Sequence, residues 1–231
     1  MAATELARAV AVIMDGNGRW AEQRGLPVAD GHRAGTKALR RTVEAAIDLG
    51  VESLAVYAFS TENWTRPIDE VEDLMEIFGD TIERELPDLA REGVVVRFVG
   101  RRDRAPASLL RQMEELEAGT AENDRLRLWI CFDYGGRAEI AEAARRIVAS
   151  GASADAVDED LVAANLAEPE MPDPDLLIRT SGEVRISNFL LWQLAYSELV
   201  FTDTLWPDFD ADDLRAGLDQ YAQRRRRFGG R

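Results

Sequence analysis

Uninterrupted blocks of apolar residues recur along this chain, and each block stops at a cluster of polar residues or glycines. Apolar runs bounded by turn residues are typical of strands that are buried on both faces. The pattern predicts six strands, at residues 10–14, 53–59, 94–99, 126–132, 176–178 and 199–201.

Between these blocks, apolar residues return at helical spacing. Residues 36–49 predict a helix that ends at Gly50, and shorter helices are predicted at 109–118 and 139–149. A long amphipathic helix is predicted after Pro67, and Pro87 is expected to kink or end it. Its apolar stripe contains Val71, Leu74, Met75, Phe78, Ile82, Leu86 and Leu89.

The alternation of strands and helices predicts an α/β fold. A central, mostly parallel six-stranded sheet is expected, flanked by helices on both of its faces. No internal repeat or linker divides the chain, so residues 1–231 are interpreted as a single domain.

Acidic residues strongly outnumber basic ones, which gives the chain a formal net charge of −15. No basic stripe stands out, and this argues against binding of nucleic acid. Lys37 is the only lysine, so an anionic ligand would be held by the forked guanidinium groups of arginine.

The chain has one cysteine, Cys131, and one histidine, His32. These counts exclude an internal disulfide, a zinc cluster and a Ser-His-Asp triad. Cys131 lies in an apolar run and is expected to be a buried thiol. No signal peptide and no apolar run of membrane-spanning length is found, so a cytoplasmic protein without a transmembrane segment is expected.

The most informative stretch is the end of the first strand, where the chain continues with Asp15, Gly16, Asn17, Gly18 and Arg19. The two glycines allow a tight turn and a close approach to a ligand. A helix that begins after a parallel strand favours anion binding, and a divalent cation can bridge a carboxylate to a phosphate. The stretch indicates either a metal-assisted diphosphate site or an ordinary strand-to-helix turn.

Polar residues also follow the second and fifth strands, namely Ser60, Glu62, Asn63, Arg179, Glu183 and Arg185. Because the carboxyl ends of parallel strands meet at one edge of a sheet, these side chains are expected to converge with Asp15. A cleft with several arginines would attract an anionic substrate to an otherwise acidic protein. For each arginine taken alone, a surface salt bridge is the alternative.

Four motifs make the chain resemble the cis-prenyltransferase family, and within it the bacterial undecaprenyl diphosphate synthases. They are MDGNGRWA, YAFSTENWTRP, RTSGEVRISNFLLWQLAYSELVFTDTLWPDF and the C-terminal RRRRFGG. The resemblance covers nearly the whole chain.

The resemblance implies a magnesium-dependent transferase that condenses isopentenyl diphosphate onto an allylic diphosphate, with farnesyl diphosphate the expected primer. The product would be a Z-polyprenyl diphosphate, most simply undecaprenyl diphosphate, the precursor of the cell-wall lipid carrier. The enzyme would be a homodimer that releases its product at the inner membrane face, where it could bind peripherally. The alternatives are a short-chain synthase making Z,E-farnesyl diphosphate and a non-catalytic partner subunit.

The resemblance also implies roles for individual residues. Asp15 would be the catalytic carboxylate and a magnesium ligand, Asn63 would serve proton removal, and Glu198 would assist the metal from the facing subunit or the same site. The allylic diphosphate would be held by Gly16, Asn17, Gly18 and Arg19, with His32 beside it. The diphosphate of isopentenyl diphosphate would be held by Arg179, Arg185 and Ser187. Trp20 and Ile186 would also bind substrate. The mobile loop would contain Ser60, Thr61, Glu62, Trp64 and Arg66, and the partner's site would receive Arg227 and Gly229.

The growing apolar chain requires a tunnel, which is expected between the sheet and two helices, the long helix and the helix of Leu39, Val43 and Ile47. In the family, bulk at the position of Ala58 shortens the product, so Ala58 and Leu126 are the candidate chain-length residues.

Two departures from the family pattern stand out. Val28, Ala29 and Asp30 occupy a segment that commonly carries an arginine, which predicts weaker allylic binding or compensation by Arg33. Asp133 stands where many relatives have asparagine.

Overall fold

Six parallel strands form one sheet in the computed structural model, which describes residues 6–84 and 86–224. The strands lie in the order β3-β4-β2-β1-β5-β6, and every neighbouring pair is parallel. The predicted six-stranded α/β fold is therefore confirmed. Their bounds are β1 Ala9–Ile13, β2 Ser53–Ser60, β3 Val94–Val99, β4 Leu126–Tyr134, β5 Leu176–Arg179 and β6 Glu198–Phe201.

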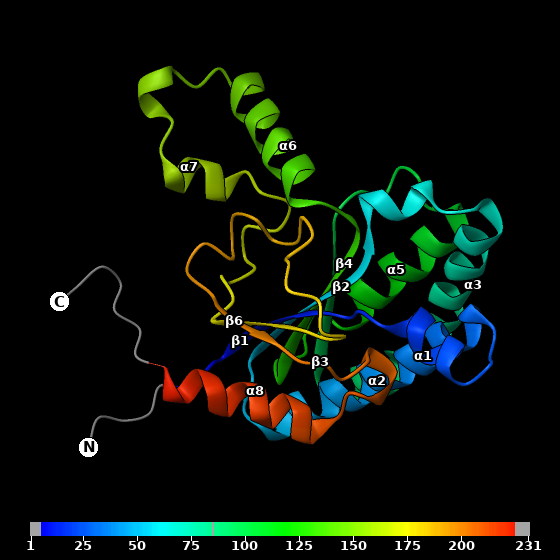
Figure 1. Ribbon diagram of the computed structural model, residues 1–231. Coiled ribbons are helices and arrows are strands. Elements are labelled where there is room, and N and C mark those ends of the chain that lie inside the picture. The colour runs from blue at the N-terminus through cyan, green and yellow to red at the C-terminus, as the bar shows by residue number, and fades with distance from the viewer. Residues whose placement is uncertain (1–5, 85, 225–231) are drawn as a thin grey trace.

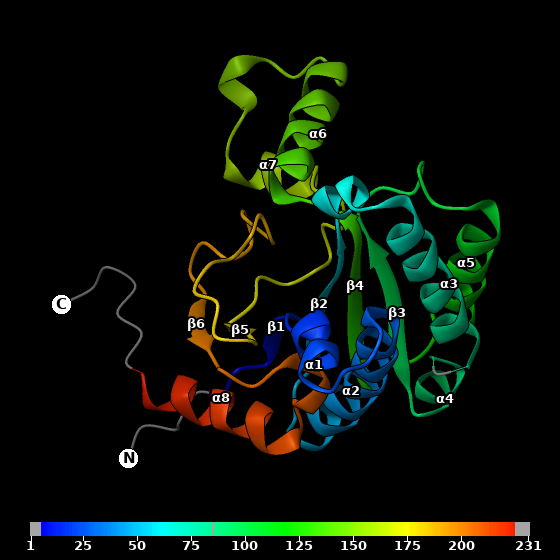
Figure 2. The same ribbon diagram turned by 45° about the vertical axis from the view of Figure 1, so that its right-hand side comes forward.

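The two faces of the sheet are covered differently. Val10 and Val12 of β1 belong to a large core shared with five helices, which are α2 (Val28–Asp48), α3 (Ile68–Arg84), α4 (Leu86–Arg91), α5 (Ala107–Gly119) and α8 (Ala211–Gln223). Figure 2 shows α2, α3 and α5 gathered beside the sheet. Ala11 and Ile13 point to the opposite face, where they join a second core. Among the described residues, that second core is completed by irregular chain between residues 171 and 194 rather than by the helices expected on both faces.

Three other helices complete the described chain: α1 (Asn17–Gln23), α6 (Gly136–Ala149) and α7 (Glu159–Ala164). Figure 1 shows α6 and α7 projecting from the body that contains the sheet. The chain also forms 3-10 turns, namely η1 (Thr61–Thr65), η2 (Ala154–Ala156) and η3 (Trp206–Asp208).

Helix positions account for most differences from the sequence-based expectations. Helix α2 begins at Val28 rather than at residue 36, because its early glycines pack against helix α1 instead of breaking the helix. A Cβ at Gly31 would lie 2.2 Å from the carbonyl oxygen of Asn17. Helix α3 ends at Arg84, before Pro87, and helices α7 and α8 were not predicted.

The connections of the sheet create one topological switch point. The chain leaves β1 toward β2 on one side and leaves β5 toward β6 on the other, although β1 and β5 are neighbours. Connections that diverge in this way leave an open crevice at the carboxyl ends of the two strands, where α/β proteins bind ligands. Asp15 follows β1, and Arg179 ends β5.

Candidate active site

A cavity of about 1230 Å³ opens at the carboxyl ends of β1, β2 and β5. The predicted convergence of strand ends therefore occurs in the structure. The predicted site residues that line this cavity are Asp15, Gly16, Asn17, Gly18, Arg19, His32, Ser60, Glu62, Asn63, Arg66, Arg179, Arg185 and Ser187.

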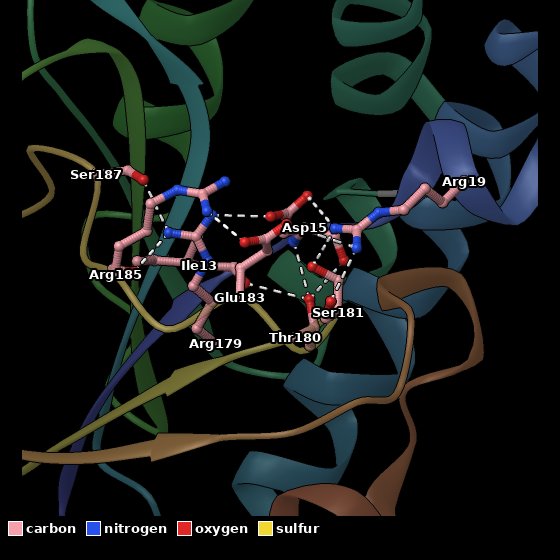
Figure 3. A network of polar contacts seen from close by, with 9 residues as sticks. All are labelled: Ile13, Asp15, Arg19, Arg179, Thr180, Ser181, Glu183, Arg185 and Ser187. Carbon is pink, nitrogen blue, oxygen red and sulfur yellow. Dashed lines mark hydrogen bonds and ion pairs between the residues drawn. The ribbon is translucent and has the colours of Figure 1, made fainter.

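Asp15 lies between two arginines at the polar end of the cavity, as Figure 3 shows. Nη2 of Arg179 donates to Oδ2 of Asp15 at 2.8 Å, and Nη2 of Arg19 lies 3.4 Å from Oδ1. Burial by itself would raise the pKa of Asp15. The hydrogen bond and charge of Arg179, with smaller contributions from Ser181 and Arg19, outweigh burial and hold that pKa below its usual value. Asp15 is therefore ionised at neutral pH.

The backbone of Asp15 is fixed by residues distant in the sequence. Its N–H donates to Oγ1 of Thr180 at 2.8 Å, and its carbonyl accepts from the N–H of Trp206 at 3.0 Å. The next residue, Gly16, has φ 113°, and a Cβ there would meet the Leu205 side chain at 2.9 Å. A glycine is thus required for the turn that presents Asp15.

Arg179 organises the loop that follows β5. Its side chain is 4% exposed, and Nη1 donates to Oγ of Ser187 at 2.8 Å and to the carbonyl of Arg185. Its Nε is buried without a hydrogen-bond partner among the described residues. Ser187 has φ 48°, in the left-handed region that serine rarely adopts. Strained backbone of this kind persists where a site requires it.

His32 lies on the other side of the cavity, on α2. Its Nδ1 is 3.4 Å from Nδ2 of Asn17. Burial, followed by the nearby charge of Arg66, lowers the pKa of His32 to about 4, against a smaller opposing effect of Glu70. The imidazole is therefore neutral at pH 7 and can act as a hydrogen-bonding group rather than as a cation.

The turn η1 holds Asn63 at the cavity by local hydrogen bonds. The Ser60 N–H donates to Oδ1 of Asn63 at 2.8 Å, and the Ser60 side chain accepts from the Asn63 backbone, which forms a reciprocal capping box. Asn188 connects η1 to the loop after β5, because its Nδ2 donates to Oε1 of Glu62 at 2.9 Å. Its Oδ1 accepts from the N–H of Arg137 at 2.9 Å.

Behind the polar end, the same cavity is lined by apolar residues of α2, α3, β2, β3 and β4. These are Leu39, Ala58, Phe59, Leu74, Ile77, Phe78, Ile82, Phe98 and Ile130. The sheet and the two helices predicted to enclose a tunnel do form its walls. Val43 and Ile47 of α2 were expected in the wall, but they pack in the core instead. Leu126 is fully buried at the start of β4 and does not line the cavity.

Several other predicted residues lie outside the cavity lining. Trp20, Thr61, Trp64 and Ile186 flank residues that line it. Glu198 begins β6 and lies opposite Leu176. This position is three residues before the Arg179–Phe201 pair, so Glu198 is about 10 Å along the strand from the carboxyl ends where Arg179 lies. The expectation that Glu198 assists the metal in the same subunit's site is wrong, and only the facing subunit remains as an option. Arg227 and Gly229 fall outside the described residues.

The expected compensation by Arg33 is not found. Arg33 pairs with Asp30 at 3.1 Å and does not line the cavity. Val28, where relatives commonly carry an arginine, does line it. It is the first residue of α2, a helix of 21 residues whose N-terminus has no side-chain cap. Pro27 and Ala29 line the cavity as well, so the N-terminal end of α2, with its free backbone amides and positive dipole end, lies at the cavity wall.

Sequence reasoning missed three residues that shape the site: Thr180, Asn188 and Trp206. Thr180 and Trp206 act through the backbone of Asp15, and Asn188 bridges two loops. A signal was available, because each lies within or next to a motif already singled out. The contacts of Thr180 and Trp206 with Asp15, and of Asn188 with Glu62, however, each span more than 120 residues of sequence, and no local pattern encodes them.

The residues present fit a magnesium ion held in part by substrate. Within residues 6–84 and 86–224, no group of three or more acidic, histidine or cysteine side chains could hold a metal without other ligands. Mg²⁺ is commonly bound by one or two carboxylates together with substrate phosphates and water. Asp15, ionised and 29% exposed in the cavity, supplies such a carboxylate.

The fold and the cavity define an α/β enzyme that binds an anionic head group beside an apolar chain. The sequence model of the Prenyltransf family, described as "Putative undecaprenyl diphosphate synthase", matches residues 13–229. The chain belongs to this family of prenyl-transferring enzymes.

Individual relatives agree with this assignment. The chain is 52% identical over 226 residues to a ditrans,polycis-undecaprenyl-diphosphate synthase ((2E,6E)-farnesyl-diphosphate specific) of Xanthomonas axonopodis pv. citri, covering 96% of this chain and 88% of the relative. It is 49% identical over 223 residues to an isoprenyl transferase of Thermotoga maritima, covering 96% of both chains.

Two crystal structures are similar as well. Lavandulyl diphosphate synthase of Lavandula x intermedia, in complex with dimethylallyl diphosphate, has a TM-score of 0.94 and 35% identity, covering 97% of this chain and 98% of that one. A probable undecaprenyl diphosphate synthase of Campylobacter jejuni has a TM-score of 0.82 and 30% identity, covering 97% and 99%. No helix among the described residues is long and apolar enough to cross a membrane.

Proposed function

We propose that this chain condenses isopentenyl diphosphate repeatedly onto farnesyl diphosphate to make undecaprenyl diphosphate. One observation carries the proposal: the cluster of Asp15, Arg19 and Arg179 opens into the same cavity as a wall of apolar side chains. A site that only bound phosphate would not need the apolar part. A site that only bound lipid would not place ionised groups at its entrance.

The residues of the cavity suggest a division of labour. Arg179, Arg185 and Ser187 would bind the diphosphate of isopentenyl diphosphate, and the unpartnered Nε of Arg179 is one donor available to it. Arg19 would bind the diphosphate of the allylic substrate, and the neutral His32 would hydrogen-bond to it. The positive charge of Arg19 would help to neutralise the leaving allylic diphosphate, which would lower the barrier to its departure.

Asn63 would orient the group that loses a proton. The capping box with Ser60, which holds its side chain at the cavity, supports this role. Magnesium, held by Asp15 and substrate oxygens, would supply Lewis-acid stabilisation of the departing diphosphate.

A homodimer is part of the proposal. Glu198 lies at the far end of β6, where its Oε2 accepts from Nη1 of Arg224 at 2.7 Å. If Glu198 assists the metal, it must do so in a facing subunit. The long apolar product would be released toward a membrane surface.

A second candidate is a synthase of a shorter product. This candidate is favoured by the TM-score of 0.94 with lavandulyl diphosphate synthase. That structure is a complex with dimethylallyl diphosphate, a five-carbon allylic diphosphate. The two candidates differ in product mass alone, because both use the same polar cluster.

The test uses purified full-length protein with magnesium, farnesyl diphosphate and labelled isopentenyl diphosphate. Butanol-extractable label together with a fifty-five-carbon diphosphate in the mass spectrum is expected. In a parallel reaction with geranyl diphosphate as the primer, a product that stops at fifteen carbons would select the shorter-chain synthase. An absence of extractable label with both farnesyl and dimethylallyl diphosphate would refute the catalytic proposal and favour a non-catalytic subunit.

A further inference from the structure

The ladder between β2 and β4 is irregular at the level of the cavity, where it skips Ala58 on β2 and Asp133 on β4. Bulges of this kind turn a side chain away from its regular direction, and they are common beside active sites. Asp133 has φ 46°, in the left-handed region that aspartate tolerates better than most residues. The bulge therefore redirects the carboxylate of Asp133.

The redirected carboxylate binds Arg104 in a two-pronged ion pair. Nε of Arg104 donates to Oδ2 of Asp133 at 2.9 Å, and Nη2 donates to Oδ1. The Asp133 side chain is 0% exposed and that of Arg104 is 34% exposed. Bidentate pairing between a guanidinium and a carboxylate fixes the plane of the guanidinium as well as its position. Arg104, in the turn between β3 and α5, is thus held in one orientation.

The same guanidinium lies over the indole ring of Trp64, with Cζ 5.0 Å from the ring centroid. This distance is within the range of a cation–π interaction. The ring also meets Phe59 edge to face, with centroids 5.2 Å apart. Nε1 of Trp64 is buried and has no hydrogen-bond partner among the described residues. The ring is therefore placed by Arg104 and Phe59 rather than by a directional hydrogen bond.

Trp64 belongs to η1, the turn that carries Asn63, and Arg66 follows this turn directly. Asn63 and Arg66 line the cavity, whereas Trp64 does not. A displacement of the Trp64 ring would move its neighbour Asn63, and a shift of about 1 Å in a reacting group can cost about a hundredfold in rate.

We propose that Arg104 and Asp133 are positioning residues, which act through Trp64 to hold the Asn63-bearing turn against the substrate. The proposal deepens the proposed function, on which its catalytic consequence rests. Asp133, a departure from the common sequence of relatives, strengthens this support because a carboxylate gives both hydrogen bonds to Arg104 a full charge.

The chain contains a closely matched control pair. Nη1 and Nη2 of Arg102 donate to the Glu117 carboxylate at 2.9 Å and 2.7 Å, and the two side chains are 35% and 17% exposed. This pair starts from the same turn as Arg104, but its partners belong to α5 and β3 rather than to η1. It reports what losing a bidentate pair does to stability alone.

The experiment compares two double variants, Arg104→Met with Asp133→Asn and Arg102→Met with Glu117→Gln. Trp64→Leu is made alone and in the first double variant, and Trp64→Phe is made in each background as the fluorescence reference. Both members of each pair are changed so that no buried charge is left without a partner. The Arg104/Asp133 variant is expected to lose about tenfold in kcat, and the Arg102/Glu117 variant less than twofold. Adding Trp64→Leu to the Arg104/Asp133 variant should lower kcat by less than a further twofold, because both changes remove the same contact, that between Arg104 and Trp64. The emission of Trp64, obtained by subtracting the spectrum of Trp64→Phe, should shift in the Arg104/Asp133 variant only.

Other outcomes would overturn the proposal. An unchanged kcat with a lower Tm would make the Arg104–Asp133 pair purely structural, and an equal loss of kcat in the control pair would make the effect non-specific. A full second tenfold loss on adding Trp64→Leu would show that the pair does not act through Trp64. If the unmodified protein has no transferase activity, the proposed function fails. The positioning role of Arg104 and Asp133 is then tested by calorimetry, which measures the affinity for inorganic pyrophosphate in the presence of magnesium. An affinity at least about threefold weaker in the Arg104/Asp133 variant alone supports it, and equal affinities in both pair variants refute it.

Discussion

The two halves of the cavity are built from different kinds of structure. The polar half lies at the ends of strands, at the starts of α1 and α2, and on the loops that follow strands, where Ser187 and Asn188 have positive φ. The apolar half lies on the interiors of strands and helices, with residues such as Leu39 and Ile130 in regular backbone. Loops can place charged groups at angles that regular backbone does not offer, and they can shift when a ligand binds.

This difference assigns two properties of the enzyme to separate regions. Changes in the polar half should alter rate and affinity, because they touch the charges of the reacting diphosphates. Changes in the apolar half should alter the length of the product, because they change the space available to the chain. Four substitutions test this separation, and they are described in order of decreasing effect on turnover.

Asp15→Asn should cause the largest loss, about a thousandfold in kcat, since it removes the carboxylate while keeping the shape of the side chain. Asparagine can still accept a hydrogen bond from Arg179, so the Tm should fall only slightly. Steady-state kinetics with magnesium and both diphosphates measure the loss, and circular dichroism verifies the fold. A rate within tenfold of the unmodified enzyme would remove Asp15 from the mechanism.

Arg179→Lys should reduce kcat/KM for isopentenyl diphosphate by about a hundredfold. A lysine cannot bridge Asp15, Ser187 and a diphosphate at once, because it lacks the planar fork of donors. Arg19→Lys is the matched control, because Arg19 is 42% exposed where Arg179 is 4% exposed, and a smaller loss is expected there. Equal losses in the two variants would contradict the central role of Arg179.

Ala58→Leu should shorten the product by several isoprene units, with less than about a fivefold change in the rate of a single condensation. The larger side chain enters the cavity between the sheet and α3 and removes space that the growing chain would fill. Leu126→Val is the control, because Leu126 is buried outside the cavity and should change stability by about 1 kcal/mol without changing product length. Mass spectrometry of the products decides, and a full-length product from Ala58→Leu would contradict the expected separation.

His32→Gln should have the smallest effect on turnover at pH 7, less than about fivefold, since the imidazole is already neutral there. Its main effect should appear in the pH dependence of stability. The pKa of His32 is about 4 in the folded state and near 6.5 when unfolded, so the unfolded state binds the additional proton between these values. Stability is therefore lost as pH falls from 6.5 toward 4, by about 2 kcal/mol in the wild type.

Urea unfolding at pH 7 and pH 4.5 measures this effect. The free energy of unfolding of His32→Gln should fall less between the two pH values than that of the wild type, although Asp15 and other carboxylates titrate in both. Identical pH dependence in the two proteins would mean that burial does not lower the pKa of His32.

The sequence by itself determined the sheet and most of the rim of the site. Six apolar runs coincide with six strands, because a strand buried on both faces must be apolar along its whole length. Asp15, Ser60 and Arg179 could be placed together from sequence, because parallel strands bring their carboxyl ends to one edge.

Only the tertiary structure decided which helices cover which face, where the channel runs and which remote residues support the site. Helix α2 packs Gly31 against Asn17. Leu126 lies outside the channel because it is at the start of β4, four residues before Ile130, which lines the channel. The pairing of Asp133 with Arg104, and of Arg104 with Trp64, depends on a bulge between strands that are distant in the sequence. A local sequence pattern indicates which residues are buried. It does not indicate which distant residue each of them contacts, because that contact forms only when the strands are aligned.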